Sequence, residues 1–342
     1  MVSINFCNPD NISSLMKFIG DNWASEHILA KDFKFMKWQH YEGEKNRYNF
    51  VIAKSNSNII GCHGFINHSR FSKKLSSNDT VWLVNWFAIK GTPNPGLDLL
   101  FFPEKNLRFN RIGTIGCNDK ATKIFKKLGF EVGELKHYFT INPIINEFKL
   151  INKQKKFAKS TSENKENKKI KFLNGKLELN IFGNNTEELV KKFGKDEIFF
   201  INRYIKHLYY KYKIYWIYDS NDPVGFFVTR ICEFKGKKAL RIVDFFGYDK
   251  ALIGINKPLE KLLIEIDAEY VDFYEYGIDD LIMSKSGLYR NNFNNQITIP
   301  NYFEPFVKKN INLRWAIKSN SSTAIPMFKG DCDQDRPNRF SK

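Results

Sequence analysis

The sequence has 342 residues, of which 15% are aromatic and 32 are Phe, so it is long enough for two domains that each bury a core. Its formal net charge is +17. This charge fits either a lysine-rich solvated surface or an anionic ligand such as phosphate, nucleic acid or acidic lipid, and charge alone does not separate these readings.

The first half of the chain has the pattern of a mixed α/β unit. A helix is expected over 12–19, followed by a strand hairpin with a polar turn at 55–58. The apolar run 81–89 predicts a long strand, and the Gly- and Pro-containing turn 91–96 leads to a short helix and a second strand over 111–117. Because a helical crossover joins the two strands, they are expected to be parallel neighbours.

The segment 118–130 gives the sharpest local signal. Asn118 can cap a helix, Gly129 can end it in the left-handed conformation, and Phe130 then begins another strand. The apolar positions of this helix fall on one face: Ala121, Ile124, Phe125 and Leu128.

The same order of elements recurs after the Lys-, Ser- and Asn-rich stretch 151–171, which predicts a linker or exposed loop. A helix is expected over 187–193, a hairpin turn at 219–222, and two parallel strands over 240–247 and 270–276. Five local matches occur in order: Ser55-Asn56 with Ser220-Asn221, Gly61 with Gly225, Val84-Asn85-Trp86-Phe87 with Val243-Asp244-Phe245-Phe246, Gly116 with Gly277, and Gly129 with Gly287. We therefore predict an α+β chain of two tandem units, each a mixed, mostly antiparallel sheet with one parallel pair and flanking helices.

The pattern of segment 118–130 (Asn, three residues on to Ala, then an aromatic, then Lys-Leu-Gly-Phe) resembles the closing motif of the GNAT acyl-CoA N-acyltransferases. The resemblance implies two tandem GNAT-like units. The expected organisation is a GNAT domain with the acyl-CoA site at 1–150, the linker at 151–171, a second GNAT-like domain for acceptor binding at 172–320, and a polar tail without an assigned role at 321–342.

In this family the long central strand and its parallel neighbour splay apart, and the pantetheine arm of coenzyme A pairs with exposed backbone groups in the gap. Carried over to this chain, the resemblance implies cofactor contacts at these positions: Phe87, Ala88, Ile89, Gly91, Thr92, Asn94, Gly96, Asn118 and Phe125. The turn departs from the family's Gly-rich pattern, because Pro93 and Pro95 lack N–H groups that could meet the pyrophosphate. The second copy lacks a glycine cradle after Gly247, so we expect one CoA site, in the first copy.

N-acyl transfer requires that an ammonium lose a proton and that a thiolate leave. The tyrosine that family members often use as the acid is replaced by Phe125, and Asn85 lies near the usual place of the base, where it can orient the amine but cannot accept its proton. His63 titrates in the useful range and is a candidate base. Asp244 is a candidate for neutralising the acceptor ammonium. The alternatives are a satisfied or exposed histidine for His63 and a strand-end cap for Asp244.

Aromatic and basic residues indicate a candidate acceptor site. Trp82 and Trp86 lie four residues apart on one strand, so they are expected on the same face. Arg203 and Tyr204 open the second copy. Such residues usually fill a core, but they also suit a nucleotide base stacked on a ring, with Arg on its diphosphate. The resemblance implies N-acylation, with acetyl or 3-hydroxybutyryl groups, of dTDP-3-amino-3,6-dideoxyhexoses for bacterial surface polysaccharide.

Two other readings stay open. Tandem GNAT units also occur in Fem-type aminoacyl-tRNA-dependent peptide ligases, and a degenerate unit can serve as a non-catalytic binding module. In the favoured reading the ligands are acyl-CoA and a nucleotide-linked amino sugar, with no nucleic-acid or membrane partner. The five cysteines are scattered without a Cys-x-x-Cys pair, so no metal site is expected. With no secretion pattern and no run of about 18 apolar residues, we expect a cytoplasmic chain whose oligomeric state the sequence leaves open.

Overall fold

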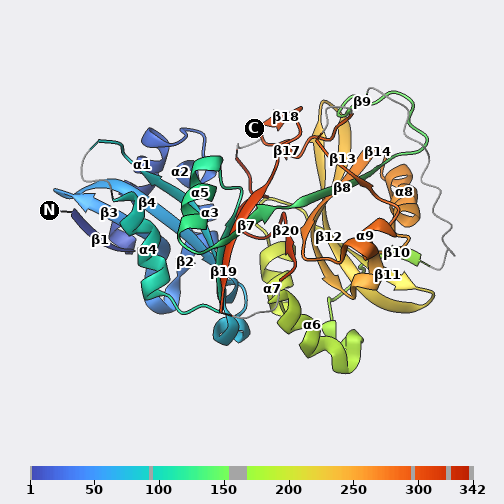
Figure 1. Ribbon diagram of the computed structural model, residues 1–342, viewed down its shortest axis with the longest axis horizontal. Coiled ribbons are helices and arrows are strands. Elements are labelled where there is room, and N and C mark those ends of the chain that lie inside the picture. The colour runs from blue at the N-terminus through green and yellow to red at the C-terminus, as the bar shows by residue number, and fades with distance from the viewer. Residues whose placement is uncertain (1, 92–94, 154–167, 294–296, 321–324, 339–342) are drawn as a thin grey trace. The chain divides into compact units, whose positions relative to one another are not determined.

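The computed structural model describes residues 2–91, 95–153, 168–293, 297–320 and 325–338. The chain divides into two compact units (Figure 1). The first unit combines residues 1–132 with two later segments, 316–322 and 336–342. The second unit combines residues 133–315 and 323–335.

These limits differ from the expected domains. Residues 133–150 belong to the second unit and not to the first. Of the expected linker at 151–171, residues 152–153 and 168–172 form short strands, and 154–167 lie outside the described residues. The expected polar tail is also corrected, because Met327 and Phe328 form a buried strand of the second unit.

The first sheet contains the predicted parallel pair. Its strands run in the order β1 (Val2–Cys7), β3 (Arg47–Ser55), β4 (Asn58–Asn67), β5 (Thr80–Ala88), β6 (Arg111–Ile115), β19 (Arg314–Ser319) and β7 (Glu131–Glu134), with β2 (Tyr41–Glu42) beside β3. The pair β5–β6 is parallel, and β1–β3, β3–β4 and β4–β5 are antiparallel. The β3–β4 hairpin turns through Asn56 and Ser57, both at positive φ, as a two-residue turn requires.

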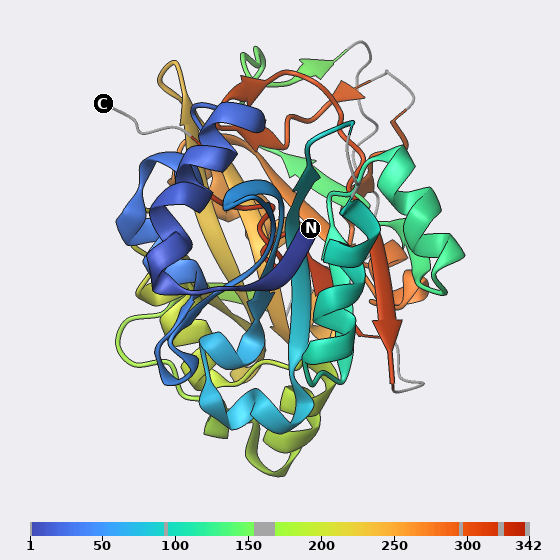
Figure 2. The same cartoon turned by 90° about the vertical axis from the view of Figure 1, so that its left-hand side faces the viewer.

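Helices cover both faces of this sheet. They are α1 (Ile12–Asn22), α2 (Ile28–Lys31), α3 (Phe33–His40), α4 (Gly96–Asn106) and α5 (Asp119–Lys127). In Figure 2 the central strands run between the N-terminal helices, in dark blue, and α4, in teal. The main core lies under α4 and α5 and includes Val51, Val81, Leu83, Leu99, Ile112 and Phe125.

The second sheet repeats this plan. Its strands run in the order β10 (Lys168–Phe172), β11 (Lys213–Asp219), β12 (Asp222–Phe234), β13 (Lys237–Gly247), β14 (Ala268–Tyr276), β8 (Lys136–Ile141) and β15 (Tyr289–Arg290). Its parallel pair is β13–β14, and β20 (Met327–Phe328) also pairs with β14. The helices are α6 (Thr186–Phe193), α7 (Glu197–Phe200), which a π-helical turn continues, α8 (Asn256–Glu265) and α9 (Asp280–Ser284). Two small sheets, β9 (Asn152–Lys153) with β16 (Ile297–Thr298) and β17 (Tyr302–Phe303) with β18 (Phe306–Val307), complete the unit.

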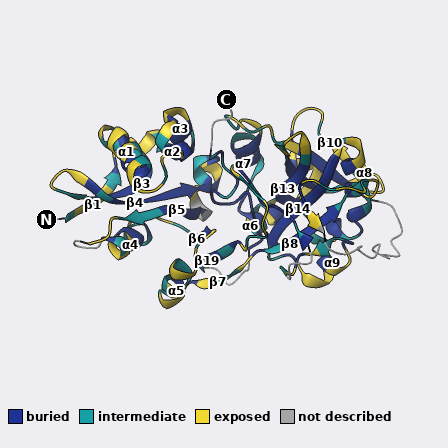
Figure 3. Cartoon of the chain, turned by 90° about the horizontal axis from the view of Figure 1, so that it is seen from above, coloured by how far each residue is buried: buried dark blue, intermediate teal, exposed yellow. Residues whose placement is uncertain are grey.

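Each sheet also contains one strand from a distant part of the sequence. The late strand β19 lies between β6 and β7, and the early strand β8 lies between β14 and β15. Gly113 on β6 permits this arrangement, because a Cβ there would lie 2.5 Å from the carbonyl oxygen of Ala316 on β19. The strands of both sheets are mostly buried, and the outer faces of the helices are exposed (Figure 3). Among the described residues, no helix is both long enough and apolar enough to cross a membrane.

Candidate functional site

The closing helix of the first unit forms as its sequence predicts. The Asn118 side chain accepts a hydrogen bond from the Ala121 N–H at 2.9 Å and caps the start of α5. Gly129 adopts φ +80°, its N–H bonds the Lys126 carbonyl, and the Phe130 N–H bonds the Phe125 carbonyl at 3.1 Å. This is the paired C-terminal arrangement that a left-handed glycine allows. The four apolar residues of one helical face all pack into the core: Ala121, Ile124, Phe125 and Leu128.

Phe125 is a packing residue in this arrangement. It is 2% exposed, and its ring lies 6.1 Å from that of Trp86 and 5.0 Å from that of Phe130, edge to face in both cases. An aromatic hydrocarbon ring enclosed in this way cannot donate a proton to a leaving thiolate. The Phe125 ring therefore makes core contacts, and its expected contact with the cofactor stays a prediction.

The central strand β5 separates from its parallel neighbour part-way along its length. The paired residues run only from Thr80 opposite Arg111 to Trp82 opposite Gly113. Beyond this point β6 continues to Ile115 and β5 continues to Ala88, but no described strand pairs with the last residues of β5 on that side. The splay that the resemblance implied is therefore present.

The direction of the backbone groups on β5 decides which of them face the gap. The Ile89 N–H donates to the Ile60 carbonyl on the β4 side at 2.9 Å. Since N–H groups alternate in direction along an extended chain, the Ala88 N–H points toward β6. Of the three positions expected to meet pantetheine, Ala88 therefore presents its N–H to the gap and Ile89 does not. The Phe87 ring packs against Phe18 and Trp23.

A bulge at Asn85 marks the place where β5 leaves its neighbour. Asn85 has φ +52°, and the β4–β5 register shifts here, so that two residues of β5 lie opposite His63. The Asn85 side chain is buried, and its Nδ2 has no hydrogen-bond partner among the described residues. The side-chain amide of Asn85 is thus a donor without a described partner, three residues beyond the last pair between β5 and β6.

The bulge also corrects the expectation that Trp82 and Trp86 share a face. An extra residue shifts the side-chain alternation by one position, so residues after the bulge change sides. Trp86 packs against the core under α4 together with Val81 and Leu83. Trp82 lies on the other face, where its indole N–H donates to His68 Nε2 at 2.9 Å.

His63 lies between the sheet and α4. It is 1% exposed, its Nδ1 lies 3.1 Å from the Leu99 carbonyl oxygen, and its ring lies 6.0 Å from that of Trp86. Because a carbonyl can only accept, Nδ1 carries the proton of the neutral ring. Burial lowers the pKa of His63 to about 4, so it is a weak base as well as an enclosed one. The geometry favours packing over the expected catalytic role.

The turn after β5 leads into α4. Gly91 adopts φ +113°, whereas Thr92 and Asn94 lie outside the described residues. The helix begins at Gly96 and has no side-chain cap, and the Trp86 indole N–H donates to the Gly96 carbonyl at 2.9 Å. This bond fixes the first turn of α4 to the strand that carries the bulge.

The parallel pair of the second unit also separates, but here the chain itself fills the gap. The β13–β14 register ends at Ile242 and Phe273. Beyond it, Met327 and Phe328 pair with β14, and the Gly330 N–H donates to the Val243 carbonyl on β13 at 2.7 Å. Residues 327–330, which we call the filling segment, therefore lie where the family places the pantetheine arm.

Comparison with known proteins identifies this architecture. No family model and no curated protein matches the chain. Among solved structures, the chain is similar to a GCN5-related N-acetyltransferase from Anabaena variabilis ATCC 29413, with 10% identity, a TM-score of 0.53, and coverage of 93% of this chain and 73% of that one. The fold is that of the GCN5-related N-acetyltransferases.

Two further structures agree with this assignment of the GNAT fold. A GCN5-related N-acetyltransferase from Kribbella flavida has 10% identity and a TM-score of 0.52, covering 93% of this chain and 71% of that one. A probable N-acyltransferase from Enterococcus faecalis V583, described as a conserved protein of unknown function, has 8% identity and a TM-score of 0.52 over 93% and 73% of the two chains. At these identities the likeness concerns the fold.

In the second GNAT-like unit, Asp244 has a partner within the protein. The Lys195 ammonium lies 2.8 Å from both Asp244 oxygens and 2.8 Å from an oxygen of Asp331, and the Tyr204 hydroxyl donates to Asp244 at 2.7 Å. All four side chains are buried. Although burial opposes its charge, the two carboxylates raise the pKa of Lys195. The ammonium that Asp244 neutralises is thus Lys195, which corrects the expectation of a substrate amine.

Arg203 and Tyr204 hold the end of the chain in the same region. The Arg203 guanidinium donates to the carbonyl oxygens of Cys332 at 3.0 Å and Gly330 at 3.4 Å. A Cβ on Gly330 would lie 2.5 Å from the Tyr204 hydroxyl, so only glycine fits there. The expectation that Arg203 and Tyr204 bind a nucleotide is therefore replaced by a structural role. Sequence reasoning missed the filling segment, although the run of five apolar residues at 324–328 within the polar tail is a signal that could have indicated a buried strand.

Proposed function

We propose that the first unit transfers an acyl group from coenzyme A to an amine. The observation that carries this proposal is the separation of β5 from β6 after Trp82, with the Ala88 N–H directed into the gap. The amide groups of pantetheine can pair with such a strand as an added strand does. The first turn of α4 lies next in sequence and suits the pyrophosphate, since N–H groups at a helix start attract anions.

The chemistry asks little of the protein beyond positioning. The ammonium of the acceptor first loses a proton to solvent, and the neutral amine nitrogen then attacks the thioester carbonyl carbon. Negative charge develops on the carbonyl oxygen, the C–S bond breaks, and the second proton of the nitrogen passes to the leaving thiolate or to solvent. The Asn85 Nδ2, which lacks a partner among the described residues, is a suitable donor to the carbonyl oxygen of the thioester. A thiol has a pKa of about 8.5, so the thiolate leaves without a dedicated acid. This agrees with the phenylalanine at position 125.

For the acceptor we propose the amino group of a nucleotide-linked aminodeoxyhexose, with an acetyl or 3-hydroxybutyryl donor. This assignment is supported by the resemblance noted in the sequence and by the net charge of +17, which suits two phosphate-bearing ligands. Trp82, Trp86, Arg203 and Tyr204 do not support it, because each makes the internal contacts described above. A panel of dTDP-linked and UDP-linked amino sugars, free amino sugars and peptides would rank the acceptors by kcat/KM.

A second candidate is a module that binds acyl-CoA without turnover. It is favoured by Phe125 in place of an acid, by the enclosed His63, and by the amide of Asn85 where a base is usual. The binding module would hold acyl-CoA at the same site as the N-acyltransferase, but it would not transfer the acyl group to an amine.

Titration calorimetry with coenzyme A and acetyl-CoA tests the proposal. We expect one molecule bound per chain and an increase in melting temperature by binding linkage. Absence of binding to both compounds would overturn both candidates. Binding without transfer to any amine in the panel would replace the enzyme by the binding module.

A further inference from the structure

The first strand of the second unit, β10, has one edge that no described strand covers. It pairs with β11 on one side only, and it ends the strand order of the second sheet. The N–H of Leu173, the next residue, donates to Ile214 at 2.9 Å. By alternation, the N–H groups of Phe172 and Ile170 point to the uncovered edge. Among the residues that the structure describes, no strand pairs with these backbone groups, which point in the direction that a further strand needs.

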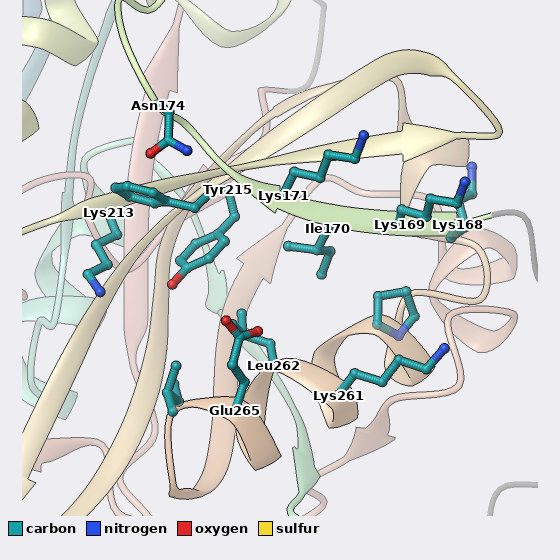
Figure 4. A pocket seen from close by; sticks show the side chains of 13 residues that line it. Lys168, Lys169, Ile170, Lys171, Asn174, Lys213, Tyr215, Lys261, Leu262 and Glu265 are labelled. Carbon is teal, nitrogen blue, oxygen red and sulfur yellow. The ribbon is translucent and has the colours of Figure 1, made fainter.

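The two faces of β10 differ in chemistry with a period of two residues. Lys169 and Lys171 are exposed on one face, and the Lys171 ammonium lies 4.9 Å from the centre of the Tyr218 ring on β11. Ile170 and Phe172 lie on the other face, and Phe172 is 48% exposed. In Figure 4, Ile170 points toward α8 whereas Lys171 points away from it. Lys169 and Lys171 thus make one face of β10 basic. The other face carries Ile170 and Phe172 after Lys168, whose ammonium pairs with Asp219 at 2.8 Å.

The apolar face opens into a trough between β10 and α8. The cavity has a volume of about 660 Å³. Its apolar floor comes from Ile170, Pro258, Leu262 and Ile266. Five lysines line the cavity as well, three of them from β10: Lys168, Lys169, Lys171, Lys213 and Lys261. One carboxylate, Glu265, lies on the α8 side beside Tyr215 (Figure 4). The trough can receive alternate apolar side chains of a strand laid along the edge.

We propose that this edge binds an extended acidic segment of another polypeptide, in which acidic and apolar residues alternate. Main-chain hydrogen bonds along β10 would supply affinity, and the two faces would select the side chains. Acidic residues would lie beside Lys169 and Lys171, and apolar residues would enter the trough. Pairing of two copies of β10 would instead bring like charges together, which is destabilising. This site is independent of the acyl-CoA site in the first unit.

Fluorescence anisotropy with a short labelled peptide in which Glu and Val alternate tests the proposal on the full chain. The double reversal K169E/K171E is expected to weaken binding about tenfold or more, because attraction becomes repulsion. The matched control K235E/K237E reverses two exposed lysines, also two residues apart, at the β12–β13 turn, and is expected to leave binding unchanged. Circular dichroism confirms that both variants fold.

Two further probes separate backbone pairing from simple charge attraction. A peptide of the same composition with Glu and Val in separate blocks, and one with N-methyl groups on alternate amides, are each expected to bind at least tenfold more weakly. The proposal would be overturned if the alternating peptide did not bind, or if the peptide with Glu and Val in separate blocks bound equally well. It would also be overturned if K169E/K171E and K235E/K237E weakened binding equally. Tighter binding of a single-stranded oligonucleotide or of anionic vesicles, abolished by K169E/K171E, would overturn it in favour of that other occupant.

Discussion

In the first unit β5 leaves β6 after Trp82 and no described strand takes its place, whereas in the second unit Met327 and Phe328 pair with β14 beyond the point where β13 departs. Both sheets therefore open at the same element of the fold. Filling the second opening requires a buried ammonium between two carboxylates and a glycine at position 330. The comparison teaches that the second copy of the repeat fills its opening with its own chain, whereas in the first copy no described strand fills the opening, which is where we propose that the ligand binds.

The largest effect is expected where the filling segment is held. In K195M, Asp244 and Asp331 would share a buried site with no cation between them. Breaking a buried ion pair in this way costs about 3–5 kcal/mol of unfolding free energy. Urea denaturation measures the loss. The triple variant K195M/D244N/D331N, which removes the charges together, is expected to recover much of it; an equally unstable triple variant would show that charge is not the cause.

In the first unit the sharpest test concerns Asn85. N85D keeps a side chain that tolerates positive φ but replaces the amide donor by a carboxylate, and N85G keeps the backbone freedom without any side chain. Removing a donor to a developing oxyanion lowers kcat by about 100-fold. We expect losses of this order in both variants, with a melting temperature close to that of the parent in N85G and a lower one in N85D, where a carboxylate is buried. Full activity in N85G would exclude the amide from the reaction.

Lys329 makes the second unit sensitive to pH. Its ammonium is buried without a hydrogen-bond partner among the described residues, 5.6 Å from the centre of the Tyr274 ring and 5.2 Å from that of Tyr302. Burial, aided by Arg241 and Arg230 and opposed by Asp335 and Asp272, lowers the pKa of Lys329 from 10.5 to about 7.

At pH values between about 7 and 10.5, Lys329 holds a proton in the unfolded chain that it lacks in the folded chain. The free energy of unfolding should therefore rise as the pH increases through this range. In K329M this part of the rise is expected to disappear, and the variant should be more stable than the parent at pH 7. Denaturation of both proteins at several pH values gives the difference. Parallel pH curves would contradict the prediction.

The smallest effect is expected at His63. Its folded pKa of about 4 lies below the ordinary 6.5, so acidification protonates the unfolded chain first and stability falls between these values. H63Q is expected to lose less stability over this range and to leave the pH profile of acyl transfer unchanged. A shifted profile would show that His63 handles a substrate proton after all.

Local chemistry made the closing helix predictable and left the strand faces uncertain. Asn118 and Gly129 act within one turn of their own positions, so their roles follow from sequence. The bulge at Asn85 depends on pairing with β4, and no local signal beyond a lone Asn marks it. Because it shifts the alternation by one residue, the face assigned to Trp86 relative to Trp82 was wrong.

Contacts between distant parts of the sequence explain the remaining differences. The insertion of β8 and β19 into the sheets joins residues more than one hundred positions apart, and the filling segment pairs with strands more than fifty positions before it. The signals that could have indicated them are small. Gly113 faces the Ala316 carbonyl, and Gly330 lies against the Tyr204 hydroxyl. Sequence alone does not show the partner of Asp244, because Lys195 lies 49 positions earlier in the loop between α6 and α7.

Hydrogen exchange with a non-hydrolysable acyl-CoA thioether tests most directly whether the ligand binds at the β5–β6 opening while the filling segment stays in the β13–β14 opening. The account predicts slower exchange at the amides of 85–89 and in the first turn of α4, with no change at 243–247 or 327–331. Protection of 243–247 together with faster exchange in 327–331 would mean that the ligand displaces the filling segment, and the account would be wrong.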